Sequence, residues 1–516
     1  MAFPNPITAN PDILFGGEWP NFMAPPNGVF ETNSTTRYTP EPDLNTLAIR
    51  MMKTTDNGVT WAEVDAAHAP VMAADGSGGT GFTQVYQFIG AVIDPATKIL
   101  YTVYFDQASF NIALAPFDAN PTSPTFDKWR PSIISTLSYL PNAANQYFNE
   151  GSFALAFRPV DKAVWMLFYG GGADANDVAT VWGAKCIVTV AGTGTWDLAL
   201  TRMAGILHDG IEWAQAGIGV DNNNNVCYWT TRHYSGFGAA AHLTVDGSGN
   251  INGYVIDAPG SGYLAGIIPL NGTPSHPPGS VHCNVSVNGG GITSLDITAW
   301  LGQPWNTATQ SLVIGTSPAN QDLMYNVIHP DNSIVGPQFV VHDALQILQA
   351  SAINCTPGNV LISTYASGAN NSGIRHVLRA PAGDTPVWED TLPTAAQDPG
   401  NQNQLMSVVH RAVDGLDYIV FALRVGATFQ FFYSTSAGIG KPFGPGILIG
   451  TAPATGGPPI AFGQLVAMIF DNLALTFGFG TGAGFPAIGM GYFELALPVP
   501  PPILTLTFKG MKVYPR

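Results

Sequence analysis

The sequence predicts an all-β protein built from repeated groups of strands, and three observations lead to this fold class. Glycine and proline account for 58 and 41 of the 516 residues, whereas charged residues make up only 10%. Short apolar runs rich in Val, Ile, Tyr, Phe and Trp alternate with polar turns along the chain. Hairpin-like segments of one plan recur about every 60 residues. Together these features favour many short strands punctuated by turns.

The repeated unit is an apolar strand, a polar turn and a second apolar strand. The turns fall near positions 95, 161, 223, 357, 415 and 472. Several hairpins are followed by another strand pair, and four strands repeated radially make the blade of a β-propeller. Residues 44–65 supply one more outer pair, which either completes a blade with 28–38 or closes the ring as a half blade. We therefore expect six or seven four-stranded blades, with seven favoured.

One turn carries the most specific motif of the chain. In Thr54–Trp61, Asp56 can accept hydrogen bonds from turn amides, Gly58 can adopt a positive φ, and Trp61 can bury its ring between sheets. This pattern resembles the Asp-box, or bacterial neuraminidase repeat. The resemblance implies a propeller like those of sialidases and related glycan-handling proteins, but the motif marks a fold and is not itself catalytic.

One interval between turns is about 134 residues long, which indicates an insertion in the ring. The inserted stretch holds two Gly-rich hairpins and is similar to small β modules of bacteriophage tail and other virion proteins; an ordinary decorating hairpin pair is the alternative. Both chain ends, rich in proline, are predicted to be extended arms. The expected organisation is an N-terminal arm at 1–27, propeller at 28–242 and 311–498, the inserted module at 243–310 and a C-terminal arm at 499–516.

Charge and cysteine content exclude several function classes. The chain has 19 basic against 35 acidic residues and a formal net charge of -16, so it lacks the basic surface that nucleic acid requires. The four cysteines show neither metal-ligand nor disulfide spacing. The first residues do not form a secretory signal, and the apolar stretch 460–500 is too interrupted for a membrane span.

A catalytic site of the sialidase type would need an arginine cluster, a Tyr/Glu nucleophile pair and an acid. The candidate arginines and acids are Arg37, Arg50, Arg232, Arg375, Arg411, Arg424, Glu150, Asp209 and Glu212. The arginine motif expected early in that family is absent, so we expect most of these arginines to be rim residues or residues that pair between blades. His208–Trp213 is interpreted as a polar loop and Asp221–Asn225 as a turn, not a calcium loop. No catalytic, cofactor-binding or metal-binding residue is therefore predicted.

These features predict a non-enzymatic virion protein, structural or receptor- and glycan-binding, such as a phage tail or fibre-associated propeller. Its expected partners are other virion subunits, contacted through the terminal arms, or a host-surface glycan, and it is expected to be oligomeric or bound in an assembly. Its expected location is the virion, assembled in the host cytoplasm, with no cofactor. The alternative is a glycoside hydrolase of the sialidase type.

Overall fold

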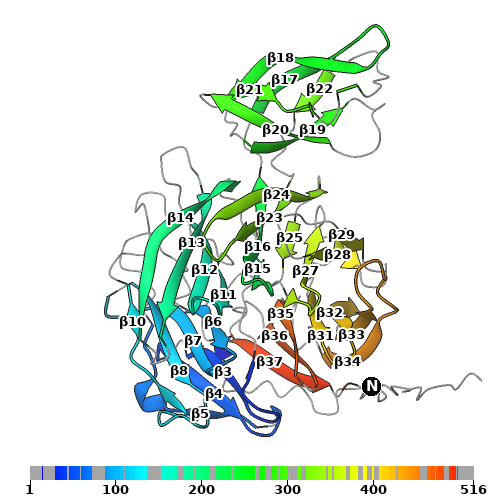
Figure 1. Ribbon diagram of the computed structural model, residues 1–516. Coiled ribbons are helices and arrows are strands. Elements are labelled where there is room, and N and C mark those ends of the chain that lie inside the picture. Colours follow the sequence, from blue (N-terminus) through cyan, green and yellow to red (C-terminus); the bar gives the residue numbers. More distant parts are fainter. Residues whose placement is uncertain are drawn as a thin grey trace, which may run out of the picture.

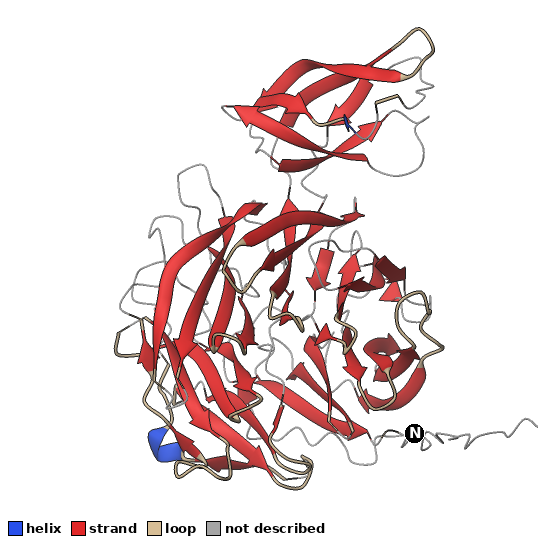
Figure 2. Cartoon of the chain, in the orientation of Figure 1, coloured by secondary structure: helices blue, strands red, loops and turns tan. Residues whose placement is uncertain are grey.

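The structure of the protein is a computed structural model, and strands dominate it. The described part of the chain contains, besides strands and turns, a single-turn 3-10 helix at Ala66–His68 (Figure 2). Within it, no helix is long and apolar enough to cross a membrane. The structure describes residues 14–15, 29–43, 46–58, 60–72, 88–109, 111–135, 153–170, 179–189, 193–208, 217–233, 237–261, 266–272, 281–288, 291–298, 301–302, 311–314, 321–343, 347–350, 354–367, 372–381, 388–391, 398–399, 406–425, 428–453, 462–470, 472–495 and 497.

Seven antiparallel sheets form the blades of a propeller (Figure 1). Blade 1 holds β2 (Phe30–Glu31), β3 (Arg37–Asp43), β4 (Ala48–Thr54) and β5 (Ala62–Val64); blade 2 holds β6 (Phe88–Asp94), β7 (Ile99–Phe105), β8 (Ile112–Asp118), β9 (Lys128–Trp129) and β10 (Ile133–Ile134). Blade 3 holds β11 (Phe153–Arg158), β12 (Ala163–Gly170), β13 (Ala179–Val188) and β14 (Gly194–His208); blade 4 holds β15 (Gly217–Val220), β16 (Val226–His233), β23 (Gln321–Ile328) and β24 (Ile334–Asp343).

The remaining three blades complete the ring. Blade 5 holds β25 (Ile347–Ala350), β26 (Asn354–Cys355), β27 (Val360–Ser367), β28 (Ser372–Pro381), β29 (Trp388–Thr391) and β30 (Asp398–Pro399). Blade 6 holds β31 (Met406–Arg411), β32 (Leu416–Val425), β33 (Thr428–Ser436) and β34 (Ile447–Pro453). Blade 7 holds β35 (Phe462–Ile469), β36 (Leu473–Thr481), β37 (Ala487–Leu495) and β1 (Leu14–Phe15). The predicted all-β propeller is confirmed, and the favoured count of seven blades is the observed one.

The first hairpin in five of the seven blades repeats one turn geometry, in keeping with the recurrence seen in the sequence. In blades 2 to 6 this turn contains a residue with φ between 53° and 70°. Asparagine and glycine tolerate this left-handed conformation, which closes a tight turn between twisted strands. The five residues are Lys98, Lys162, Asn224, Asn359 and Gly415.

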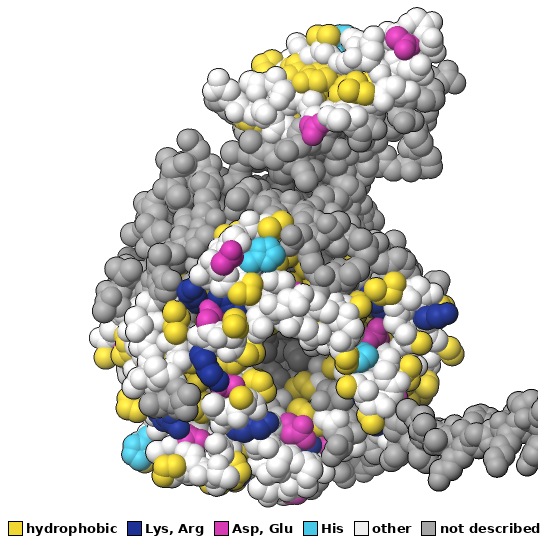
Figure 3. Space-filling model, in the orientation of Figure 1, with side chains coloured by type: hydrophobic (Ala, Val, Ile, Leu, Met, Phe, Trp, Pro, Cys, Tyr) yellow, Lys and Arg dark blue, Asp and Glu magenta, His cyan; other side chains and the backbone are white. Residues whose placement is uncertain are grey.

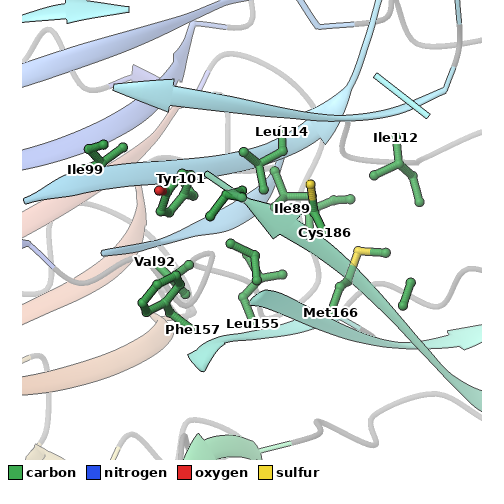
Figure 4. Close-up of a cluster of buried hydrophobic side chains, with 14 of the residues drawn as sticks. Ile89, Val92, Ile99, Tyr101, Ile112, Leu114, Leu155, Phe157, Met166 and Cys186 are labelled. Carbon is green, nitrogen blue, oxygen red and sulfur yellow. The ribbon is translucent and has the colours of Figure 1, made fainter. Parts of the chain in front are cut away.

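The core of the ring is divided into apolar layers between neighbouring blades. The layer between blades 2 and 3 contains the fully buried Val103, Leu114 and Met166, and its residues from the two blades face one another (Figure 4). Tyr101 of blade 2 stacks on Phe157 of blade 3, with ring centroids 5.8 Å apart. Because apolar side chains line both sides of a blade, burial against its two neighbours stabilises the ring.

The ring closes through strands from opposite ends of the chain. Leu14 pairs with Gly489 and Phe15 with Ile488, so β1 supplies the outermost strand of the last blade. These two residues belong to the predicted N-terminal arm. The predicted C-terminal arm, 499–516, lies outside the described residues.

Six strands between β16 and β23 form a sheet of their own, which we call the inserted module. They are β17 (Phe237–Val245), β18 (Ile251–Ser261), β19 (Gly266–Gly272), β20 (Val281–Asn288), β21 (Gly291–Leu295) and β22 (Ser311–Ile314). The sheet curls until its edge strands β18 and β21 contact each other, and it encloses a separate apolar core that includes Leu243, Ile251 and Ile292. Figure 1 shows the module projecting away from the ring.

Candidate functional site

The propeller has two chemically different faces. At the turn face, the first hairpin of each blade reverses direction; at the connecting face, the chain passes from one blade to the next and the inserted module leaves the ring. Several polar residues at the turn face bind residues of their own or a neighbouring blade, and Figure 3 shows basic and acidic side chains lying next to one another on the ring.

Three fully buried arginines hold neighbouring blades together at the turn face. Each donates hydrogen bonds from its guanidinium group to the next blade around the ring, which satisfies a charge that burial would otherwise destabilise. The pairs are Arg37 Nε to Glu494 Oε1 at 3.2 Å, Arg158 Nη1 to the carbonyl oxygen of His329 at 3.0 Å, and Arg379 Nε to Asp417 Oδ2 at 3.1 Å.

The predicted rim or pairing role of the candidate arginines is confirmed for Arg37 and Arg411. Arg411 donates to Asp414 Oδ2 at 2.9 Å within its own hairpin turn. In both residues the guanidinium group therefore binds other residues of the propeller. The turn face is therefore a structural surface, and a substrate-binding arginine has to be sought at the other end of the strands.

Asp94 joins blades 2 and 3 at the same face. It accepts hydrogen bonds from Lys162 Nζ at 2.9 Å, Thr97 Oγ1 at 2.8 Å and the amide of Ala96 at 2.9 Å. Burial alone would raise the pKa of Asp94, but these hydrogen bonds outweigh burial and hold the pKa below its ordinary value. The carboxylate consequently stays charged under all mildly acidic conditions.

This lowered pKa predicts that the contact between blades 2 and 3 is weakened by acid. A carboxyl group whose pKa is lower in the folded than in the unfolded chain stabilises the fold above its unfolded pKa of about 4, and loses this contribution as pH falls through the folded value. In the Asp94→Asn variant, the free energy of unfolding should therefore fall less steeply as the pH drops below about 4. Urea unfolding midpoints measured at neutral and acidic pH test this; an unchanged pH dependence would show that the Asp94 contact with Lys162 does not stabilise the seam.

The Thr54–Trp61 turn has the predicted hydrogen bonds. Asp56 Oδ1 accepts from the amide of Thr60 at 2.9 Å, and Gly58 has a φ of 84°. Trp61 is partly buried, and the expected packing of its ring between blades stays a prediction. The turn lies between β4 and β5, at the turn face, where it orders the end of blade 1.

The Asp221–Asn225 segment is the turn predicted from the sequence. Asp221 Oδ1 accepts from the amides of Asn223 and Asn225 at 2.8 and 2.9 Å. Asn222 Nδ2 reaches the carbonyl oxygen of Thr356 in blade 5 at 2.9 Å. Throughout the ranges that the structure describes, no group of three His, Cys, Asp or Glu residues is arranged to hold a metal ion.

At the connecting face, strand register brings chemistry-bearing residues of blade 5 together. Tyr365 in β27 is directly opposite His376 in β28, and Ala366 is opposite Arg375. Directly opposed residues of an antiparallel pair share one face of the sheet. Side chains along a strand alternate between its two faces, and Tyr365 and His376 are each an even number of residues from Leu361 and Leu378. They therefore belong to the same faces as these two leucines, which pack toward blade 4.

Blade 4 contributes a third residue to the same seam. His233 ends β16 and alternates in step with Cys227, which packs against the Leu361 layer of blade 5. The alternation therefore places His233, Tyr365 and His376 on facing sides of neighbouring blades at their connecting ends. We call these three residues the blade 4–5 group.

On its other side, blade 4 carries a row of opposed residues across three strands. Arg232 in β16 is opposite Asp322 in β23, and Asp322 is opposite His342 in β24. Arg232 alternates in step with Tyr228, which is buried in the layer shared with blade 3. A cation, a carboxylate and an imidazole thus lie side by side one residue away from the blade 4–5 group.

The arginines and acids that the sequence offers as candidates for a catalytic site are divided between the two faces of the ring. Arg232, Arg375 and Arg424 lie at the connecting ends of β16, β28 and β32, and Arg50 lies opposite Glu41 in blade 1. Three candidate acids, Glu150, Asp209 and Glu212, lie outside the described residues, as does most of His208–Trp213; His208 itself ends β14. Sequence reasoning missed Tyr365, His376, His233, Asp322 and His342.

No protein-family model matches the chain, and no curated protein matches it. Among solved structures, an ulvan lyase of polysaccharide lyase family PL25 is similar, with a TM-score of 0.49 and 10% identity over 93% of this chain and 94% of that one. The polysaccharide lyase Uly1 matches with a TM-score of 0.32 and 10% identity over 78% of this chain and 89% of that one. The sialidase of Trypanosoma rangeli matches with a TM-score of 0.37 and 10% identity over 93% of this chain and 56% of that one.

These likenesses are of fold, and they correct the predicted function. The similar structures named above are enzymes that act on glycans, and none of them is a virion protein. The prediction of a non-enzymatic virion or host-attachment protein is therefore wrong, as is the prediction that the chain is not an enzyme. The predicted propeller is retained: the chain is a seven-bladed β-propeller.

Proposed function

We propose that the protein is a glycan-processing enzyme that cleaves a carboxylate-bearing polysaccharide by β-elimination at the connecting face of blades 4 to 6. The observation that carries this proposal is the direct opposition of Tyr365 and His376 at the connecting end of blade 5, with His233 of blade 4 on the facing side. An imidazole accepts and donates protons near neutral pH, and a tyrosine phenol can act as a positioned general acid or base.

The reaction needs three contributions from the chain. A base removes the proton at the carbon next to the sugar carboxylate, the bond from the adjacent carbon to the bridging oxygen breaks, and a carbon–carbon double bond forms. An acid returns a proton to the departing oxygen, so atoms and charge balance without a co-reactant. The blade 4–5 group supplies the base and the acid.

Arginine supplies the third contribution. A guanidinium group that binds the sugar carboxylate in two places withdraws charge and stabilises the carbanion-like transition state. Arg375 precedes His376 in β28, so the alternation puts it on the other face of blade 5, in step with Val377, which packs against blade 6; Arg424 lies at the connecting end of blade 6. We assign binding of the sugar carboxylate to Arg375. Arg424 is the next protein cation that the bound polysaccharide chain would reach.

Elimination fits the blade 4–5 group better than glycoside hydrolysis does. Hydrolysis with retention or inversion uses a pair of carboxyl groups that flank the scissile bond. The three residues of the blade 4–5 group are a phenol and two imidazoles, which can serve as the base and the acid of an elimination. We also infer that the Thr54–Trp61 turn is an Asp-box with a purely structural role. Attachment to other proteins through the terminal arms stays a prediction.

The proposal is tested by incubating the purified chain with a panel of uronate-containing polysaccharides and sialosides. Elimination creates a double bond conjugated to the carboxylate, which is detected by ultraviolet absorbance, whereas hydrolysis releases reducing ends without that absorbance. We expect absorbance to rise with at least one uronate polymer. Release of reducing ends or sialic acid without the absorbance would replace elimination by hydrolysis, and no cleavage of any substrate would contradict the proposed function.

A further inference from the structure

The outermost strand of blade 6 carries an exposed apolar patch. β34 is the last strand of its sheet, and among the described strands it pairs with β33 alone. Ile447 and Leu448 begin β34 and are 51% and 41% exposed, and Ile439, in the loop before β34, is 42% exposed. These residues, which we call the edge patch, are three of the ten large apolar side chains that the structure describes as exposed. Such a concentration at a strand edge indicates a binding surface.

The edge patch lies at the turn face of the ring. β33 ends at Ser436, which is opposite Asp417 beside the first hairpin turn of blade 6, so β34 starts from this face. In the neighbouring blade 7, β37 ends at Leu495, which is opposite Leu473 beside the first hairpin turn of that blade. The chain therefore leaves its last described strand at the same face as the edge patch.

Leu497, the last residue that the structure describes, brings the chain to β34. It is 7% exposed and belongs to the apolar cluster between blades 6 and 7, which also contains Ile449 of β34. Ile449 directly follows Leu448 of the edge patch. Residues 498–516, which we call the C-terminal segment, therefore start beside the edge patch.

The C-terminal segment has the composition of a spacer followed by a strand. Residues 498–502 contain four prolines, and residues 504–509 alternate between apolar and polar side chains. The six residues from Leu497 to Ile503 span about 19 Å in a polyproline conformation. The seven residues of β34 span about 23 Å, and Leu497 packs near the third of them, so the alternating stretch can reach the whole edge of β34.

We propose that the C-terminal segment adds to the outer edge of β34 as a further strand and covers the edge patch. The chain uses the same device in blade 7, where Leu14 and Phe15 pair with β37 as its outermost strand. Because Leu497 is held beside Ile449, the segment has a high effective concentration at its own edge, which favours docking within one molecule over docking on a second copy.

The added strand protects blade 6 from other chains. An open strand edge offers backbone amides and carbonyls to any extended segment, and main-chain hydrogen bonds provide the affinity of such strand addition. The apolar side chains of the C-terminal segment cover Ile447 and Leu448 at the same time. This role does not depend on which polysaccharide the protein cleaves.

Amide hydrogen exchange measured by mass spectrometry tests the docking. A truncated protein that stops at Leu497 should exchange the amides of residues 447–453 about tenfold faster or more than the full chain, because those that face outward lose their partners. The amides of β14, the outer strand of blade 3, are the internal control and should exchange at the same rate in both proteins. Equal exchange of residues 447–453 in the two proteins would overturn the inference.

A substitution in the full chain tests the same inference if the truncated protein fails to fold. Ile447→Asp combined with Leu448→Asp places charge on the covered surface and should accelerate tryptic cleavage after Lys509 and Lys512 by about tenfold. Val160→Asp is the control, because Val160 is 58% exposed in the first hairpin turn of blade 3. Unchanged cleavage of the double variant, or equal acceleration by the control, would refute docking on the edge patch.

Dilution separates docking within one molecule from docking between two. We expect the exchange rate of the amides of residues 447–453 in the full chain to be independent of protein concentration. Protection that is lost on dilution, together with a dimer that dissociates in sedimentation velocity experiments, would overturn the inference, because the strand would then come from a second copy. None of these measurements uses a substrate, so failure of the inference and failure of the proposed function are distinguishable.

Discussion

Replacing Arg37 with methionine is expected to lower the free energy of unfolding by about 3–5 kcal/mol, because it leaves a buried carboxylate without its partner. Arg37 is fully buried in blade 1 and binds Glu494 of blade 7, whose side chain is 6% exposed. It also donates to the carbonyl oxygens of Asn33 and Ser34 at 2.7 and 3.2 Å, and its guanidinium group lies 4.3 Å from the centre of the Phe470 ring. The contact spans the seam where the ring closes.

Urea unfolding measures this loss against a matched control. Lys128→Met removes a cation that is 54% exposed and bound to Asp65, and such a surface pair contributes at most about 1 kcal/mol. Combining Arg37→Met with Glu494→Gln should recover part of the loss, because the unpaired charge is removed. An Arg37→Met protein as stable as Lys128→Met would show that the closing seam does not depend on the buried pair.

Tyr365→Phe is expected to reduce kcat/KM for elimination by roughly 10²–10⁴-fold, the range that general acid–base catalysis supplies. The change removes the hydroxyl and keeps the ring, so packing in the seam between blades 4 and 5 should be retained. His376→Gln should also reduce activity and should alter the acidic limb of the pH–rate profile, because an imidazole titrates near neutral pH and an amide does not. Initial rates over a range of pH, with urea unfolding as a check on folding, measure both effects.

A loss of activity in Tyr365→Phe that is matched by a loss of stability would assign the hydroxyl to structure. Full activity of both variants would remove the blade 4–5 group from catalysis. The pH–rate profile also separates the two roles, since it reports the essential acid and base, and removal of either changes it.

The ring could be predicted because each hairpin is a local feature. The turn at Asp221–Asn225, for example, joins its carboxylate to its own amides, so its pattern is visible within five residues. The long interval before the turn of blade 5 revealed the insertion by its length alone. The two-residue strand β1 could not be predicted, because it is too short to show any period.

The candidate site could not be predicted, because it is assembled by pairing across long separations. His233 and Tyr365 are 132 residues apart, and they come to lie in neighbouring blades only because the module loops out between β16 and β23 and blade 5 packs against blade 4. The pairing of Tyr365 with His376 depends on the register of β27 and β28, which neither composition nor motif spacing fixes. Alternation counted from the buried Leu361 and Leu378 is the one feature that could have placed both on the same face.

The most direct measurement is the rate of formation of the conjugated double bond by three proteins: the unaltered chain, Tyr365→Phe and His410→Gln. His410 is the matched histidine of the turn face, where its Nδ1 lies 2.8 Å from Asp417 Oδ1 and its side chain is 12% exposed. With the site at the connecting face, Tyr365→Phe should lose activity by about 100-fold or more, and His410→Gln should keep the rate of the unaltered chain within about threefold. Loss of activity in His410→Gln together with full activity in Tyr365→Phe would place catalysis at the turn face and contradict the proposed site.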